Sequence, residues 1–139
     1  MRPALTFAAA LAAALVAAAC SSQGPSAETP EGALSLFLET SSPLSREFDR
    51  ERAFKLLAPE VRRELQRRAA QASKQGGRRF APSDMLVVER VTPRWQIKRM
   101  ETRDEGDRAV VTVHGAEPSQ TAEVELRREG DGWTVVLPL

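Results

Sequence analysis

The side chains that most enzyme chemistry requires are scarce in this chain of 139 residues. It has one histidine, His114, one cysteine, Cys20, and no tyrosine. A single histidine without a cysteine cluster offers no zinc site. The sequence also contains neither the G-x-S-x-G turn of a serine hydrolase nor a glycine-rich phosphate loop. We therefore expect no enzymatic activity, no metal and no cofactor.

His114 is the residue best suited to act as a general base near neutral pH. It lies in the segment RAVVTVHG at 108–115, in which valines alternate with Thr112 and His114. This alternation predicts a strand that buries the valines and places His114 on the opposite face. We therefore interpret His114 as a solvated or packed strand residue.

Three carboxylates, those of Asp104, Glu105 and Asp107, share one predicted turn. Hard oxygen ligands in a loop suit calcium, but the spacing differs from that of a known calcium loop. Acid–base catalysis needs a partly desolvated pair of groups with separated pKa values, and a hairpin tip does not provide one. We interpret these side chains as parts of a solvated turn.

Basic residues are concentrated between positions 59 and 79, where only Glu60 and Glu64 oppose them. A basic helix on a tethered protein can lie on anionic lipid or on an acidic partner. The interpretation that we favour is a solvated helix face with glutamate–arginine pairs at i,i+3 and i,i+4. The candidate recognition residues of the chain are Arg62, Arg63, Arg67, Arg68, Arg99 and His114.

Cys20 ends an alanine-rich apolar run that follows the basic start Met1-Arg2-Pro3. The run covers about 15 residues, fewer than the roughly 20 that a membrane-spanning helix needs. Small residues precede the cysteine, as at a signal cleavage site. The arrangement resembles a bacterial lipoprotein signal, which implies that Cys20 is lipidated and becomes the first residue of the mature protein. The alternative is an ordinary secretory signal, which would release a soluble protein with a free thiol, a liability in an oxidising compartment.

The lipoprotein resemblance divides the chain into a signal peptide at 1–19, a lipidated cysteine and flexible tether at 20–29, and one domain at 30–139. Lipoprotein processing attaches more than one acyl chain, and two chains hold a protein stably on a membrane. Ser21 after the cysteine is similar to the outer-membrane default of enteric bacteria. The expected location is therefore the bacterial envelope, on the outer membrane and facing the periplasm. Removal of the signal leaves 19 basic and 19 acidic residues, and this balance does not indicate a nucleic-acid binder.

Apolar periodicity predicts three helices in the first half of the domain. The first covers 30–40 and begins with Thr29 as N-cap, and the second covers about 49–57. The third runs from Pro59 to about Lys74 and is ended by two glycines. A short helical turn is expected to start at Pro82, although the valines at 87, 88 and 91 would also suit a strand.

From Trp95 onward the apolar period changes to two, which predicts a meander of four antiparallel strands. The first strand is expected to turn Trp95, Ile97 and Arg99 inward, with the charge of Arg99 at the rim. The last two strands have Leu126 and Trp133 among their inward residues. Helices followed by a meander give an α+β order. We expect the N-terminal helices to pack in the concave face of a strongly twisted sheet, which gives a half-open cone.

The chain resembles the nuclear transport factor 2-like superfamily, most closely its small secreted or lipid-anchored members of unassigned function. The stretches that carry the resemblance are TPEGALSLFLET at 29–40, RAFKLLAPEVRREL at 52–65, RAVVTVHG at 108–115 and AEVELRREGDGWTVVLPL at 122–139. This resemblance implies the cone-shaped fold. The alternative is a cystatin-like fold, in which a helix packs on an antiparallel sheet. Enzymes of this superfamily place Asp, Tyr, His or Arg inside the cone, and those sites do not carry over here.

Three functional hypotheses follow. The first is a non-catalytic domain that binds an envelope protein and is anchored to the membrane through lipidated Cys20. The second is a small apolar ligand bound in the cone, which requires an open cavity of a few hundred Å³. The third is an isomerase-like or dehydratase-like enzyme, which requires an ionisable residue deep in that cavity.

Overall fold

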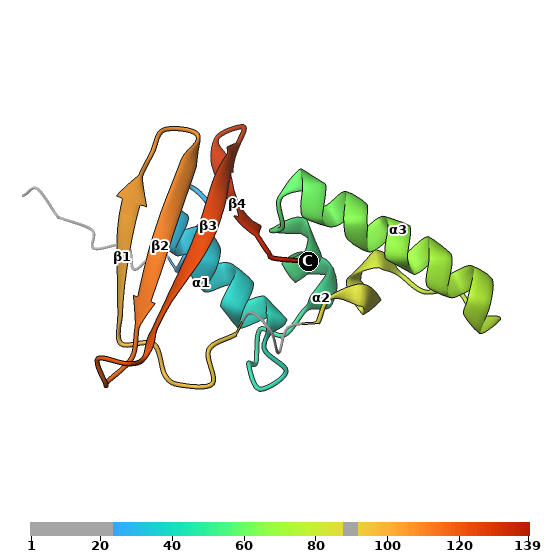
Figure 1. Ribbon diagram of the computed structural model, residues 1–139, viewed down its shortest axis with the longest axis horizontal. Helices are drawn as coiled ribbons and strands as arrows, with labels where there is room; N and C mark the ends of the chain where they lie inside the picture. The colour runs from blue at the N-terminus through green and yellow to red at the C-terminus, as the bar shows by residue number, and fades with distance from the viewer. Residues whose placement is uncertain (1–23, 88–91) are drawn as a thin grey trace, which may run out of the picture.

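The computed structural model describes residues 24–87 and 92–139. Within these ranges, three α-helices and one short 3₁₀ helix precede a four-stranded antiparallel sheet (Figure 1). The predicted α+β class and order of elements are therefore confirmed. The signal peptide, Cys20 and the valines at 88 and 91 lie outside the described residues.

The helices are α1 (Pro30–Ser41), α2 (Arg50–Lys55), α3 (Pro59–Gly76) and the 3₁₀ helix η1 (Pro82–Met85). They lie close to the predicted ranges, although α2 is shorter and α3 slightly longer than expected, and capping residues mark the start of α1 and the end of α3. The hydroxyl of Thr29 accepts a hydrogen bond of 3.1 Å from the N–H of Gly32 at the start of α1, as an N-cap does. At the other end of α3, Gly77 has a φ of 66°, the left-handed conformation in which a glycine commonly ends a helix.

The sheet is a meander in the order β1-β2-β3-β4. Its strands are β1 (Arg99–Asp104), β2 (Arg108–His114), β3 (Thr121–Glu129) and β4 (Gly132–Val136). Consecutive strands pair antiparallel, with Val111 opposite Val124 and Leu126 opposite Val135. The predicted meander and the inward positions on its last three strands are therefore confirmed.

The core lies between α1 and the inner face of the sheet. Helix α1 contacts β1, β2 and β4, and Leu34 and Phe37 on its buried side have no exposed surface. From the sheet, Val111, Leu126 and Val135 are equally buried. The remaining core side chains come mainly from the α2–α3 region and the strands; they include Ala53, Leu57, Val61, Leu65, Ala109, Val113, Trp133 and Leu137.

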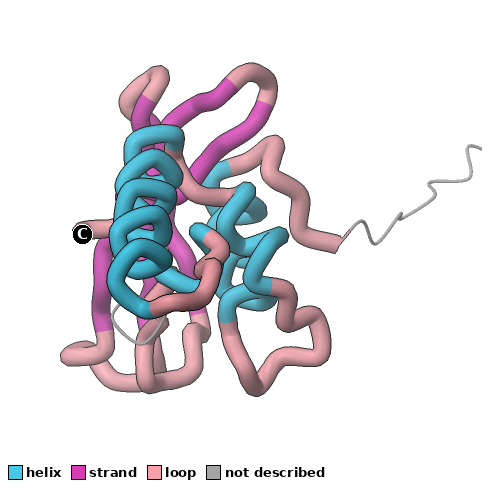
Figure 2. Tube along the Cα trace, turned by 90° about the vertical axis from the view of Figure 1, so that its right-hand side faces the viewer, coloured by secondary structure: helices cyan, strands magenta, loops and turns pink. Residues whose placement is uncertain are grey.

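Helices α2 and α3 lie beside the sheet, past β4 (Figure 1), and α3 is in front of the sheet in the side view of Figure 2. The junction between them runs along the outer edge of β4. There the N–H of Ala58 donates to the carbonyl of Val135 and the N–H of Val135 donates to the carbonyl of Leu56, both at 2.8 Å. Helix α3 packs on η1. The buried residues of α3 are Val61, Leu65 and Ala69.

The inward phase predicted for the first strand holds for Trp95 and Ile97, which pack against the core, but it is wrong for Arg99, which is exposed at the start of β1. Strand β1 begins at Arg99, four residues after Trp95, and the segment 92–98 is not a strand. Side chains alternate across a sheet only where the backbone is extended, so the alternation at Trp95 and Ile97 does not carry through to β1. The inner side chains are instead Met100 and Thr102, and Thr102 donates a hydrogen bond to Glu31 of α1.

Candidate binding surface

The interior between α1 and the sheet is filled by side chains. In the described part of the chain, the buried polar residues are Thr40, Ser41, Ser83 and Thr134, none of which ionises near neutral pH. The hydroxyls of Thr40 and Ser41 donate to carbonyls within α1. This interior therefore offers neither space for a ligand nor a buried acid or base at these positions.

The arginines of α3 are engaged with glutamates. Glu64 accepts hydrogen bonds from Arg67 at 2.6 and 2.7 Å and from Arg68 at 2.8 Å. These two guanidinium groups lower the pKa of Glu64 from 4.5 to about 2. Arg62 forms a 2.6 Å ion pair with Glu129 at the end of β3. The predicted i,i+3 and i,i+4 pairing is thus confirmed at Glu64, while Arg63 is exposed.

Arg99 and His114 lie together on the outer face of the sheet, where both contact Glu101. His114 Nε2 is 3.3 Å from Glu101 Oε2, and Arg99 forms an ion pair with the other oxygen. His114 is therefore on the face that the strand alternation predicts. The six candidate recognition residues consequently form two separate sets, on α3 and on the outer sheet face, and do not surround one common site.

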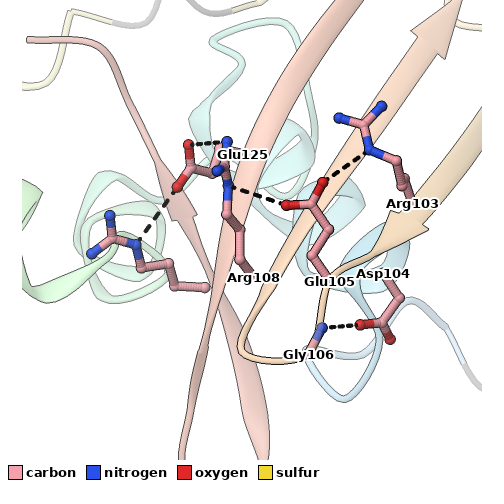
Figure 3. Close-up of polar contacts among 7 residues, drawn as sticks. Arg103, Asp104, Glu105, Gly106, Arg108 and Glu125 are labelled. Atoms are coloured by element: carbon pink, nitrogen blue, oxygen red, sulfur yellow. Dashed lines mark hydrogen bonds and ion pairs between the residues drawn. The ribbon is translucent and has the colours of Figure 1, made fainter.

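A ladder of opposite charges continues across the rest of the outer face (Figure 3). Glu105 contacts Arg103 at 3.0 Å and Arg108 at 3.7 Å, and Arg108 also lies 3.2 Å from Glu125. Arg127 is 3.6 Å from Glu125 and 2.9 Å from Glu60 of α3, the latter without hydrogen-bond alignment. Exposed pairs of this kind contribute about 0–1 kcal/mol each. The charges within these pairs neutralise one another.

The predicted acidic turn between β1 and β2 is a compact hairpin tip. Asp104 Oδ1 accepts a 2.9 Å hydrogen bond from the N–H of Gly106 (Figure 3). Gly106 has a φ of 86°, which favours glycine because it has no Cβ. Over the described ranges, no group of three or more His, Cys, Asp and Glu side chains is placed to hold a metal ion.

Among the described residues, one half of β3 has no strand paired with it on the β4 side. Strand β3 has nine residues, but β4 pairs with it only from Glu125 to Glu129. The next positions in the same register would place Leu137 opposite Val124 and Pro138 opposite Glu123. Proline has no N–H and cannot donate to a ladder. The pairing therefore stops after Val136, and the chain leaves the sheet toward α2 (Figure 1).

A groove of about 420 Å³ opens at this point. We call it the β3-edge groove; its lining is Ala122, Glu123, Val124, Glu125, Val136, Leu137 and Pro138. Its volume lies within the roughly 300–1,000 Å³ of typical ligand pockets, and its lining is mostly apolar, as theirs is. Sequence reasoning missed this surface. The available signal was Pro138, which lies two residues after the end of β4.

The outer edge of β4 is covered instead. Besides the contacts of Leu56 and Ala58, the N–H of Trp133 donates a 2.8 Å hydrogen bond to the carbonyl of Ala27. Ala27 belongs to the segment expected to be a flexible tether, and its side chain packs against the core. The end of that segment thus covers the outer edge of β4 at the start of the strand.

No protein-family model, no curated protein and no solved structure matches this chain. Among the described residues, no helix is both long enough and apolar enough to cross a membrane. The fold and the surface together define a small α+β domain with a filled interior. In the part of the chain that the structure describes, the outer edge of β1 and the Thr121–Val124 part of β3 have no strand beside them.

Proposed function

We propose that this chain is a lipid-anchored protein of the bacterial envelope whose domain binds a protein partner and performs no chemistry. The observation that carries the proposal is the contrast between a filled interior and the open β3-edge groove. A binding site inside the cone would need a cavity there, yet Phe37 and Leu126 fill that space with no exposed surface. The groove, in contrast, is accessible from outside.

We also propose that the domain is a small variant of the nuclear transport factor 2-like fold. The support is the order of three helices and a meander whose last strand begins Gly132-Trp133. Fold similarity would not assign an activity, because function resides in particular sites. The cystatin-like alternative has one helix across the sheet, and here too only α1 contacts three strands.

The proposed anchor is supported by the sequence around Cys20 and by the docking of Ala27. Seven peptide units separate these residues, so the lipidated end can reach at most about 25 Å from Ala27. Ala27 lies at the start of β4, beside the turn at Gly130. The domain would therefore be held with the β3–β4 turn toward the membrane.

Fractionation tests the anchor. Wild-type protein should stay with membranes after a high-salt wash and partition into detergent, whereas Cys20→Ala should accumulate unprocessed or unlipidated. Incorporation of labelled palmitate should be lost in the variant alone. Recovery of wild-type protein in the soluble fraction would contradict the anchor.

Genetic complementation tests the absence of chemistry. His114→Ala and Arg99→Ala, made on the chromosome, should behave as wild type and unlike a full deletion. Both residues lie on the outer face and contact Glu101, so neither change should disturb the core. Loss of function in either variant at normal abundance would locate an active or recognition site at that residue.

A further inference from the structure

We infer that the β3-edge groove binds an extended polypeptide segment of apolar–basic–apolar pattern, which adds a strand beside Thr121–Val124. This inference rests on the proposed function and specifies its partner. Strand addition to an open sheet edge is a common mode of peptide recognition, in which main-chain hydrogen bonds give affinity and alternate side chains give specificity.

The main-chain groups of Glu123 provide the hydrogen bonds. In β3, the even-numbered residues face β2, since Arg128 donates to the carbonyl of Asp107 and Gln120 accepts from the N–H of Gly115, both at 2.8 Å. Hydrogen-bonding direction alternates along an antiparallel strand, so the N–H and C=O of Glu123 point to the side of β4. Pairing with β4 begins only at Glu125. These two groups are therefore available to a strand that enters the groove.

The side chains around Glu123 specify the pattern of the incoming segment. Residues that face each other on adjacent strands project to the same side of the sheet. The residue opposite Glu123 would project to the outer face beside this carboxylate, which forms no ion pair within the described residues. A lysine or arginine satisfies that position. The residues before and after it would project inward over Ala122, Val124 and Leu137, which suits apolar side chains.

A second copy of the chain fits this edge poorly. Two copies related by a two-fold axis would pair Thr121–Val124 antiparallel with itself, which brings the two Glu123 carboxylates close together. Like charges opposite each other destabilise strand pairing. A small apolar molecule also fits less well, because it would cover the N–H and C=O of Glu123 without satisfying them, at a cost of about 1–3 kcal/mol for each group.

The position of the groove agrees with access from the aqueous side. Its strand segment, Ala122–Val124, lies at the end of β3 opposite to the turn at Gly130, where Ala27 docks. In Figure 1, the two ends of β3 lie at opposite ends of the sheet. A tether that holds the β3–β4 turn toward the membrane therefore leaves the groove free to receive a partner.

A peptide titration tests the inference. The full lipidated protein is placed in nanodiscs of uncharged phosphatidylcholine, and a fluorescein-labelled octapeptide of alternating valine and lysine is titrated by anisotropy against empty nanodiscs. Wild type should bind saturably. Glu123→Lys should weaken binding at least about tenfold, which corresponds to about 1.4 kcal/mol. Glu39→Lys, an equal charge change at an exposed position of α1 outside the groove, should bind as wild type does.

Two further probes separate strand addition from simple charge attraction. A valine–glutamate octapeptide should bind Glu123→Lys better than wild type. A valine–lysine octapeptide N-methylated at alternate residues on its pairing edge should lose at least about tenfold in affinity, because it cannot complete the ladder. Equal binding of the methylated peptide, or equal binding by Glu123→Lys and wild type, would overturn the inference.

Other occupants would give their own results. A wild-type dimer in sedimentation that Glu123→Lys dissociates would assign the groove to a second copy and overturn the inference. Saturable binding of the uncharged probe N-phenyl-1-naphthylamine, in competition with the peptide and unchanged by Glu123→Lys, would assign it to an apolar ligand. These outcomes leave the anchor untouched, whereas release of wild type from membranes would refute the anchor and leave the peptide result standing.

Discussion

The two halves of β3 differ in what lies beside them. From Glu125 to Glu129 the strand is paired with β4, whose outer edge is in turn covered by Ala27 and the α2–α3 junction. From Thr121 to Val124 no described residue pairs with this edge of β3, because Pro138 ends the pairing with β4. Exposed edges invite association, and natural proteins usually cover or interrupt them. We infer that the unpaired half, from Thr121 to Val124, is the place where a partner strand can pair.

The largest effect should come from the closed half, at Trp133. Its side chain is 2% exposed, its N–H holds Ala27, and Arg128 lies over its ring at 4.6 Å. Truncation by Trp133→Ala should lower the free energy of unfolding by about 3–5 kcal/mol in urea melts. Glu125→Ala on the outer face serves as the control and should cost less than about 1 kcal/mol. Equal losses would mean that the strand register is wrong by one residue.

A second prediction concerns residues 26–29, the N-terminal segment that includes Ala27 and covers the outer edge of β4 at its start. A Cβ on Gly32 would lie 2.0 Å from the carbonyl oxygen of Ser26 and 2.8 Å from Thr29 Oγ1. Gly32→Ala should therefore displace this segment and destabilise the domain by about 1–3 kcal/mol. Gly24→Ala is the matched control, since nothing lies within 4 Å of its Cβ. If both variants melt alike, residues 26–29 do not hold β4.

A third prediction concerns Glu64, which has two arginine partners on α3. The pKa of Glu64 is lowered from 4.5 to about 2 by Arg67 and Arg68. Between these pH values the unfolded chain binds the proton and the folded chain does not, so stability from this group is full above 4.5 and is lost as pH falls toward 2. The stability difference between wild type and Glu64→Gln should therefore shrink over this range. A difference independent of pH would show that the carboxylate is not stabilised by these pairs.

The smallest effect on stability should come from the open half. Pro138→Val gives residue 138 an N–H opposite Glu123, which permits β4 to lengthen and to close the groove. The free energy of unfolding should change by no more than about 0.5 kcal/mol, as for other surface changes. Binding of the valine–lysine octapeptide should nevertheless fall at least about tenfold. If this variant binds the octapeptide as wild type does, the peptide does not bind in the β3-edge groove.

Local patterns were sufficient to predict most elements of the fold. The cap at Thr29, the glycine end of α3 and the alternation along β2 and β3 act within single elements, so a single sequence contains the required information. The phase of β1 could not be read in this way. The pattern that begins at Trp95 looks like a strand, but the backbone is not in a strand before Arg99.

The candidate site was less predictable because it depends on contacts between distant segments. Arg62 pairs with Glu129, 67 residues later in the chain, and spacing on one helix cannot indicate such a partner. The β3-edge groove likewise arises from the difference in length between two strands and from the path of the chain after Val136. Pro138 indicates that the last strand ends, but not that the preceding strand continues beyond it.

Native-state amide hydrogen exchange tests the central claim most directly, since it compares the two halves of one strand in one experiment. The amides of Glu123 and Arg127 both point toward β4. Of these two residues, only Arg127 is paired with a described residue there, namely Thr134. The open edge predicts that the Glu123 amide exchanges at least about 100-fold faster than the Arg127 amide, and that the valine–lysine octapeptide slows Glu123 selectively. Equal protection of both amides in the free protein would show that the edge is already covered and would contradict the account.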